Sequence, residues 1–430
     1  MPRSRFTSSV LKYAVESEPI VFPISFGPVQ LNKTVKSLLK DNGIDTKNVK
    51  FNFFINGEVI DCPLKDFLEL KGISEEIEEI VYDIDIKPPN LENETKFEEQ
   101  VYGMKFKSKW LLCATGDLEI IDSTSPVKPV VSISCDVDML QVEWLSFDED
   151  SNEAVIIAGG IKGYMYSWKC DLKNRTVTQQ FSYKGHTNDI SRIAVSTSRG
   201  LIASGCSDGM LKIWSTSQEL TDLSAETGGI PHVPKNKDPK KIPIRIPLLT
   251  LLAHSESLKC IKWLDPEMDA ANVVIDSSVK STSGNLMTIG NDITLWHING
   301  FESTVLRRIT LPCKFMVMDH NQHTQLILIG CSDTRLRCFD FREAKHEVNT
   351  INGAHDKGIN VVKWNPINPN MFVTCSYDGA TKLWDARNIK SARAIVHKST
   401  EAIRCCDWSH DGELLAVSYT DGSLKFFRFD

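Results

Sequence analysis

The sequence predicts a small α+β domain of the β-grasp type followed by an all-β propeller with seven blades. From about Glu98 to Asp430, short strand-like runs close on a bulky apolar residue that recurs roughly every 40–45 residues, a period typical of propeller blades. Residues 1–87 lack this period and carry mixed strand and helix patterns. Residues 88–97 are polar and begin with two prolines, which predicts a linker between the domains.

The clearest predicted blade lies between Ala354-His355 and Trp384-Asp385. It contains strand-like runs at 359–364 and 371–375 and a turn at Asp378-Gly379, where a short acid can accept hydrogen bonds from turn amides. Alignment on Trp384 gives seven equivalent positions, which lie 43 to 47 residues apart except for one interval of 82: Ile121, Trp168, Trp214, Trp296, Phe339, Trp384 and Phe427. Seven such positions predict seven blades.

This pattern resembles the WD-repeat family, in which hydrogen bonds join a histidine, an aspartate and a tryptophan within each well-formed blade. The resemblance implies two complete sets, in blades three and six: His186, Asp208 and Trp214, and His355, Asp378 and Trp384. Blades one, two, four and five depart from the pattern and are predicted to be degenerate. The chain ends near the third strand of blade seven, so we expect its outer strand, if there is one, to pair loosely and to come from about 91–100.

The long interval contains an insertion, Ser215–Leu248, which is polar and rich in proline. Such composition predicts a disordered surface loop, so we assign 215–248 as disordered. The insertion carries a basic cluster that could serve nuclear import or make a weak contact to RNA phosphates: Lys235, Lys237, Lys240, Lys241 and Arg245.

The first 87 residues have the order of elements expected of a ubiquitin-like β-grasp. A helix is predicted over Asn32–Leu39, with Asn32 as a possible N-cap, and a strand over 51–55. Asn56-Gly57 is a strong hairpin signal, and Leu64–Leu70 predicts a short helix. Alternating apolar residues over 77–86 predict the last strand. Since this domain does not end in Gly-Gly, we expect it to act by surface recognition rather than by conjugation.

The stretch FFINGEVIDCPLKDFLELKGIS closely resembles the N-terminal domain of the WD-repeat subunit of the pescadillo complex, an assembly factor for the large ribosomal subunit. The shared features are Gly57-Glu58, Lys71-Gly72-Ile73-Ser74 and Pro88-Pro89, and the resemblance extends to both domains in order. It implies a non-enzymatic factor of the nucleolus and nucleoplasm. The propeller would dock on the block-of-proliferation protein and pescadillo, and through them on pre-ribosomal particles. Midasin, an AAA-type ATPase, would grip the ubiquitin-like domain and release the factor.

In that family a glutamate four residues after the loop glycine is offered in trans to the metal-ion-dependent adhesion site of midasin. Counting from Gly72 gives Glu76, with Glu75 as the runner-up. A Mg²⁺ ion held by the partner can accept one more hard carboxylate ligand, so this protein needs no cofactor of its own. The alternative is a solvated acidic face, because seven acids lie in this region against one base, Lys71: Glu69, Glu75, Glu76, Glu78, Glu79, Asp83 and Asp85.

Composition narrows the remaining function classes. The net charge of −7 gives no overall attraction to nucleic acid, and no apolar run reaches the length of a membrane span. The twelve cysteines include no C-x-x-C pair, which favours reduced thiols over a zinc site. No phosphate-binding loop or nucleophile elbow indicates an enzyme. The rival interpretation is a substrate receptor of a ubiquitin ligase or another scaffold, and proteasome binding would then need an apolar patch on the β-grasp domain.

Overall fold

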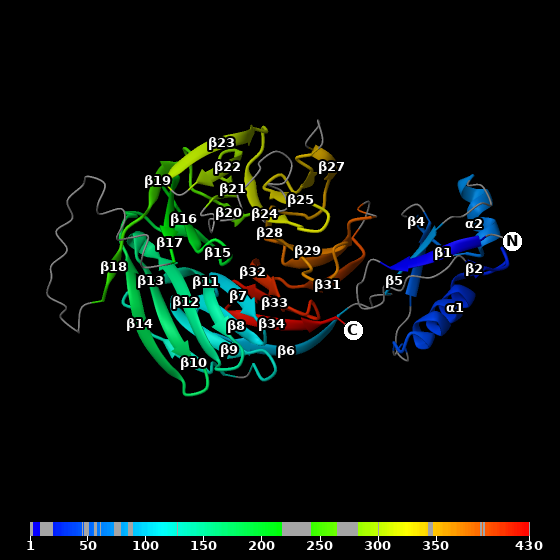
Figure 1. The fold of residues 1–430 in the computed structure, drawn as a ribbon, viewed down its shortest axis with the longest axis horizontal. Helices are drawn as coiled ribbons and strands as arrows, with labels where there is room; N and C mark the ends of the chain where they lie inside the picture. Colours follow the sequence, from blue (N-terminus) through cyan, green and yellow to red (C-terminus); the bar gives the residue numbers. More distant parts are fainter. Residues whose placement is uncertain are drawn as a thin grey trace, which may run out of the picture.

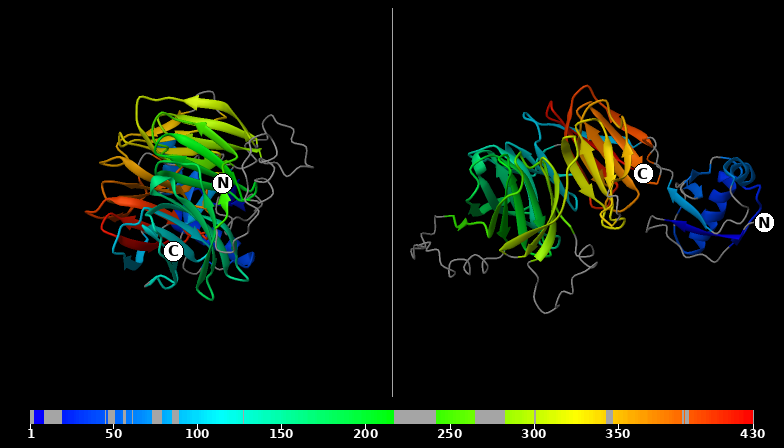
Figure 2. Two further views of the ribbon diagram at one scale, coloured as in Figure 1. Left: turned by 90° about the vertical axis from the view of Figure 1, so that its left-hand side faces the viewer. Right: turned by 90° about the horizontal axis from the view of Figure 1, so that it is seen from above.

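The computed structural model describes residues 3–8, 20–44, 46, 51–55, 58–60, 62–72, 79–84, 89–126, 128–216, 242–264, 283–299, 301–342, 347–387, 389 and 392–429. The described chain forms an N-terminal β-grasp domain and a seven-bladed propeller, which confirms the predicted fold class (Figure 1). The β-grasp domain lies beside the propeller rather than over its central channel, next to blade six (Figures 1 and 2).

The β-grasp domain is a five-stranded sheet with two helices. The sheet has the order β2-β1-β5-β3-β4, in which β1 and β5 are parallel and the other pairs are antiparallel. The elements follow the chain as β1 (Arg3–Ser8), β2 (Ile20–Val21), α1 (Pro28–Asp41), β3 (Phe51–Ile55), β4 (Glu58–Val59), α2 (Leu64–Lys71) and β5 (Glu79–Ile84). Both predicted helices and the predicted strands over 51–55 and 77–86 are present, the last of them described over 79–84.

The core of this domain lies between α1 and one face of the sheet. Leu31, Val35 and Leu39 of α1 are fully buried, and Phe51 and Phe53 of β3 pack in the same cluster. The predicted N-cap at Asn32 is wrong, because α1 begins after Gly27, with a proline at its first position, where the fixed φ of proline suits a helix. The Asn32 side-chain amide instead donates a hydrogen bond of 3.0 Å to the carbonyl oxygen of Phe51, which ties the helix to the strand.

Each propeller blade has four antiparallel strands, to which blade two adds a short fifth strand at its outer edge. The blades are arranged around a channel, and the first strand of each blade lies innermost (Figure 1). Blade one comprises β7 (Gly103–Lys107), β8 (Trp110–Thr115), β9 (Asp117–Asp122) and β10 (Val131–Ile133). Blade two comprises β11 (Met139–Asp148), β12 (Glu153–Gly160), β13 (Met165–Asp171) and β14 (Thr176–Tyr183). Blade three comprises β15 (Ile190–Ser196), β16 (Leu201–Cys206), β17 (Met210–Ser215) and β19 (Leu249–Leu252).

Blade four comprises β20 (Cys260–Trp263), β21 (Ser283–Ile289), β22 (Ile293–Asn299) and β23 (Glu302–Ile309). Blade five comprises β24 (Phe315–His320), β25 (Ile327–Cys331), β26 (Leu336–Phe339) and β27 (Glu347–Ile351). Blade six comprises β28 (Ile359–Trp364), β29 (Met371–Ser376), β30 (Ala380–Asp385) and β31 (Ala394–Lys398). Blade seven comprises β32 (Ile403–Trp408), β33 (Leu414–Tyr419), β34 (Ser423–Arg428) and β6 (Asn90–Lys96).

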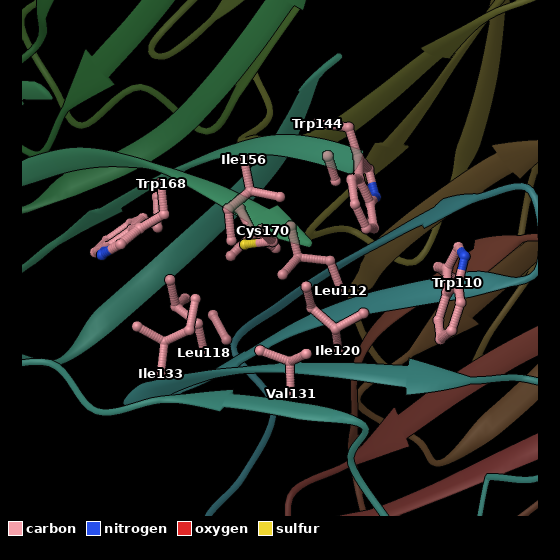
Figure 3. Close-up of a cluster of buried hydrophobic side chains, with 14 of the residues drawn as sticks. Trp110, Leu112, Leu118, Ile120, Val131, Ile133, Trp144, Ile156, Trp168 and Cys170 are labelled. Carbon is pink, nitrogen blue, oxygen red and sulfur yellow. The ribbon is translucent and has the colours of Figure 1, made fainter. Parts of the chain in front are cut away.

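All seven positions that the sequence aligned on Trp384 lie in the third strand of their blades, and every one of these side chains is buried. The reason is that the third strand packs between neighbouring blades. Figure 3 shows such a contact between blades one and two, where Leu112, Leu118 and Ile120 face Ile156 and Cys170. The same burial requirement in each blade produces the repeat that the sequence displays.

The N-terminal side of the chain closes the propeller. Strand β6 pairs antiparallel with β34 along its whole length, and the two strands are joined by side-chain ion pairs, with 2.9 Å between Glu92 Oε2 and Arg428 Nε. The prediction of a loosely paired or three-stranded blade seven is therefore wrong. So is the predicted linker 88–97 over residues 90–96, which form the outer strand of the propeller.

The described end of the insertion is ordered. Residues 242–248 follow the edge of blade two, where β18 (Ile244–Arg245) pairs in parallel with β14. The guanidinium of Arg245 is buried and lies 3.9 Å from the centre of the Phe181 ring. The predicted disorder of 215–248 is therefore wrong for 242–248 and for Ser215, which ends β17, and Arg245 is not available for RNA. The four lysines of the predicted basic cluster lie outside the described residues.

Candidate interaction surfaces

The loop predicted to carry the metal-binding glutamate leaves the exposed end of α2. Helix α2 ends at Lys71, and Gly72 follows in the left-handed conformation, with φ 64° and ψ 28°, which glycine adopts without steric cost. The Gly72 amide donates a hydrogen bond to the carbonyl oxygen of Glu69, and the Leu70 side chain is 81% exposed. Glu75 and Glu76 lie in the segment 73–78, outside the described residues. Strand β5, which lies in the middle of the sheet, is described from Glu79.

The sheet face away from the β-grasp core carries Phe54, a large apolar residue of β3. It follows Phe53 in β3 and so points to the opposite face, outside the core cluster. Its ring is nevertheless only 2% exposed, and the guanidinium carbon of Arg387 lies 4.2 Å from the ring centre. Arg387 belongs to blade six and forms a two-point ion pair with Asp385, which fixes the guanidinium plane. The propeller therefore contacts the apolar residue of this sheet face.

Blade six contains the hydrogen-bonded set that the sequence predicts. The Nδ1 atom of His355 lies 3.0 Å from Asp378 Oδ2, and its Nε2 atom lies 2.6 Å from the Thr374 hydroxyl oxygen. The same hydroxyl accepts a hydrogen bond of 2.8 Å from Trp384 Nε1. Thr374 thus links the histidine to the tryptophan, a fourth member that the sequence analysis did not name.

Blade three contains a shorter version of the set. Ser204 Oγ lies 2.7 Å from His186 Nε2 and accepts a hydrogen bond of 2.8 Å from Trp214 Nε1. Asp208 does not bond to the histidine and instead accepts hydrogen bonds from the Asn188 side chain and the Met210 amide. The expected link between His186 and Asp208 is therefore not formed.

Blade four, predicted to be degenerate, brings the same four residue types together. His254 Nε2 lies 2.8 Å from the Thr288 hydroxyl oxygen, which also accepts a hydrogen bond of 2.8 Å from Trp296 Nε1. His254 Nδ1 lies 3.0 Å from Asp292 Oδ1. Asp292 precedes Trp296 by four residues, whereas the sequence pattern relied on a spacing of six. The signal that could have found it is the combination of His254 with an acid in the next inter-strand turn.

Burial disfavours the protonated form of these histidines. Burial lowers the pKa of His355 and of His254, although the neighbouring aspartates Asp378 and Asp292 act in the opposite direction. Burial, with Lys212 nearby, lowers the pKa of His186 to about 4. The hydrogen bonds of these imidazoles join strands within their blades and stabilise the fold.

Three pairs of opposite charges lie on the inner strands, deeper in the channel than the residues at which these strands begin. Lys105 Nζ lies 3.1 Å from a Glu143 carboxylate oxygen in the next blade, and Lys363 Nζ lies 2.7 Å from Asp407 Oδ1. Lys262 and Asp319 form a third pair, and Asp319 also accepts a hydrogen bond from the Trp364 amide. Burial alone would lower the pKa of Lys363, but Asp407 and Asp319 raise it above its usual range. These pairs join neighbouring blades.

Other kinds of site are poorly supported in the described part of the chain. No group of three or more histidine, cysteine or acidic side chains there is placed to hold a metal ion. The twelve cysteines are free thiols, and burial raises the pKa of several, such as Cys170 and Cys338 to about 12. No helix in the described ranges is both long and apolar enough to span a bilayer.

Comparison with known families assigns both domains. Residues 4–68 match the NLE (NUC135) domain, and residues 177–215, 346–385 and 391–428 match the WD domain, G-beta repeat. Each of the three repeat matches begins near the outer strand of one blade and ends with the third strand of the next. Such an offset fits a ring in which each repeat unit spans two adjacent blades.

Several proteins named ribosome biogenesis protein WDR12 homolog are similar to the chain. The one from Aedes aegypti is 26% identical over 424 residues, 97% of this chain and 93% of its own length. The one from Anopheles gambiae is 26% identical over 429 residues, covering 98% and 94%. The one from Drosophila simulans is 27% identical over 424 residues, covering 97% and 92%. The chain is thus a relative, along nearly its whole length, of the WDR12-type ribosome biogenesis proteins, and it joins an NLE domain to a WD-repeat propeller.

Proposed function

We propose that this protein is a non-enzymatic assembly factor for the large ribosomal subunit that works in the nucleolus and nucleoplasm. The observation that carries the proposal is similarity across both domains to proteins named for ribosome biogenesis. A match to a propeller alone would give much weaker support for this function, because propellers serve many functions. The proposed role needs binding surfaces and no catalytic group.

The finer proposal assigns a task to each domain. The propeller docks on the block-of-proliferation protein and pescadillo in the pre-ribosomal particle, and the β-grasp domain is the handle that midasin grips. Glu76, or Glu75 as the runner-up, supplies a carboxylate to a Mg²⁺ ion that the adhesion site of midasin holds. Support comes from the exposed end of α2, where Gly72 turns the chain into the loop. Hard oxygen ligands suit Mg²⁺, so a projecting carboxylate is a fitting last ligand.

The rival, a substrate receptor of a ubiquitin ligase, is not favoured. Proteasome binding through the β-grasp domain would need an accessible apolar patch. Phe54 lies on the relevant sheet face, but it is 2% exposed and stacks against Arg387 of the propeller. RNA contact through the insertion also loses support, since Arg245 is buried against Phe181, which leaves only the four lysines between 235 and 241 for such a role.

The handle is tested by pull-down of the purified full chain with the adhesion domain of midasin, with Mg²⁺ and with EDTA. We predict that binding requires the metal and is lost in three variants of Glu76. Glu76→Ala removes the carboxylate, Glu76→Asp shortens the side chain that carries it, and Glu76→Gln replaces it with a neutral amide. Glu69→Ala is the matched control, an exposed acid in the last turn of α2, and should bind normally. The melting temperature should stay unchanged in all four variants.

Two outcomes would contradict this mechanism: binding that persists in EDTA, or full binding by Glu76→Ala when Glu75→Ala also binds. Loss of binding in Glu75→Ala alone would transfer the role to the runner-up. Binding to the block-of-proliferation protein should survive every one of these changes, because that contact is assigned to the propeller.

A further inference from the structure

The channel opens on one side into a hollow of about 290 Å³, here called the channel mouth. It lies where the inner strands begin, and the seven blades each contribute lining residues. Three of these are cations, Arg192, Lys259 and Arg404, from blades three, four and seven. Tyr102, Asn360 and Tyr377 also line the hollow and carry side-chain groups that can form hydrogen bonds. Among the described residues, no acidic side chain lines the hollow.

The three cations of the mouth differ from those deeper in the channel. Lys105, Lys262 and Lys363 each have a carboxylate partner in the next blade. Across the described residues, by contrast, no carboxylate forms an ion pair with Arg192, Lys259 or Arg404. Their hydrogen bonds go to neutral groups: Arg404 Nε donates to Gln100 Oε1 at 2.8 Å, and Arg192 donates to the carbonyl oxygen of Ser191 at 2.7 Å. Three like charges around one hollow favour the entry of an anion.

The rim around the mouth carries more acids than bases, although Lys314 and Lys357 are exposed there, two and three residues from a lining residue. Glu99, Asp138, Asp189 and Glu256 are exposed, and each lies one to three residues from a lining residue along the chain. Glu99 and Asp138 flank Gly116, since their carboxylate oxygens lie 2.9 and 3.8 Å from the position that a Cβ atom would occupy there. A nucleic-acid backbone carries a negative charge at every phosphate and would meet these acids. One anionic side chain can pass between them into the basic hollow.

We propose that the channel mouth binds a protein segment that inserts one acidic or phosphorylated side chain, with basic or neutral residues on either side. The recognised group is an oxyanion, either a carboxylate or a phosphate. The planar guanidinium groups of Arg192 and Arg404 can donate paired hydrogen bonds to it, and Lys259 adds a point charge. The Tyr102 and Tyr377 rings supply aromatic surface next to these cations, as Arg404 already lies 5.9 Å from the Tyr102 ring centre.

The test is a peptide array probed with the labelled full chain. Nine-residue peptides carry glutamate, phosphoserine or serine at the centre, and each centre is flanked by lysines, by glycines or by glutamates. We expect peptides with an anionic centre and lysine flanks to bind, and those with a serine centre or glutamate flanks not to bind. Comparison of glutamate with phosphoserine shows which oxyanion is preferred.

Affinities of the best peptide are then measured by calorimetry for three variants. Lys259→Glu and Arg404→Ala should each weaken binding by about tenfold or more, since each removes a charge-assisted contact. Lys398→Ala is the matched control, because Lys398 is an exposed lysine on the outer strand β31, and its affinity should equal that of the wild type. Circular dichroism checks that the variants are folded.

The proposal is overturned if no anionic centre is preferred, or if Lys259→Glu and Arg404→Ala both bind the peptide like the wild type. It is also overturned if a ten-nucleotide oligouridylate binds the chain more tightly than the best peptide and loses affinity in the same two variants. That result would make the mouth a nucleic-acid site.

Discussion

Thr374 is the residue whose removal gives the sharpest test of the propeller interior. Its side chain is fully buried in β29, and its hydroxyl is shared by two polar groups. A threonine hydroxyl has one donor and two acceptor sites. The hydroxyl can therefore accept from Trp384 Nε1 and donate to His355 Nε2, which leaves His355 Nδ1–H to donate to Asp378. Thr374→Val keeps the shape of the side chain and removes the hydroxyl that links this chain of bonds.

The magnitude follows from the two groups left without a partner. Each buried polar group that loses its hydrogen bond costs about 1–3 kcal/mol, so the substitution should lower the free energy of unfolding by about 2–6 kcal/mol. Unfolding entropy is about 2.1 cal/mol/K per residue near 60 °C, or about 0.7 kcal/mol/K for a propeller of roughly 340 residues. The melting temperature should therefore fall by about 3–8 °C.

Differential scanning calorimetry of the full chain measures this shift. Thr374→Ser keeps the hydroxyl and should recover most of the loss. Thr178→Val, on the exposed side of the outer strand β14, makes the same chemical change away from any such network and should alter stability by less than about 0.5 kcal/mol. A Thr374→Val protein that melts like the wild type, or no lower than Thr374→Ser, would refute the reasoning.

Two further predictions concern closure of the ring and pH. A chain that starts at Pro89 keeps β6, and its propeller should have the same melting temperature as in the full chain. A chain that starts at Glu98 lacks β6 and should have a lower melting temperature. Equal melting temperatures of the two chains by calorimetry would show that β6 does not close the ring. Burial lowers the pKa of His186 and His320 to about 4 from an unfolded value near 6.5, so between pH 6.5 and 4 the unfolded chain binds more protons. Stability should be full above pH 6.5 and fall as pH drops through this window, and His320→Gln should reduce the fall; equal pH dependence in the variant would contradict the assignment.

The parts of the fold that the sequence could predict are those under a burial constraint. Each third strand must fill the space between two blades, so Trp168, Trp214 and their equivalents recur at a fixed period. Strand β6 has no such signature. Its sequence, NLENETK, is polar except for Leu91. It pairs with β34 through backbone hydrogen bonds while its side chains stay exposed or half-buried. An outer strand of this kind has the composition of a linker, which explains the incorrect boundary.

The site residues were predictable only where they are close in sequence. The blade-six set fits a pattern with fixed spacing, but the turn before Trp296 is shorter, so Asp292 escaped it although His254 and Thr288 complete the same arrangement. The channel mouth could not be found in this way. Its three cations lie more than 60 residues apart along the chain, and only the ring of inner strands brings them to one hollow.

The geometry also separates the two proposed binding surfaces. Strand β30 begins near the mouth, where Tyr377 lies, and ends at the far side, where Arg387 contacts Phe54. Strand β6 enters the propeller from the same far side, since Asn90 pairs with Arg428 at the end of β34. A segment bound in the mouth would therefore not compete with a partner that grips the β-grasp domain. A pull on that domain would, however, reach the propeller through β6, the strand that closes the ring. The ion pairs of Glu92 and Glu94 with β34 lie on this path, so they resist the first step by which a pulled ring would open.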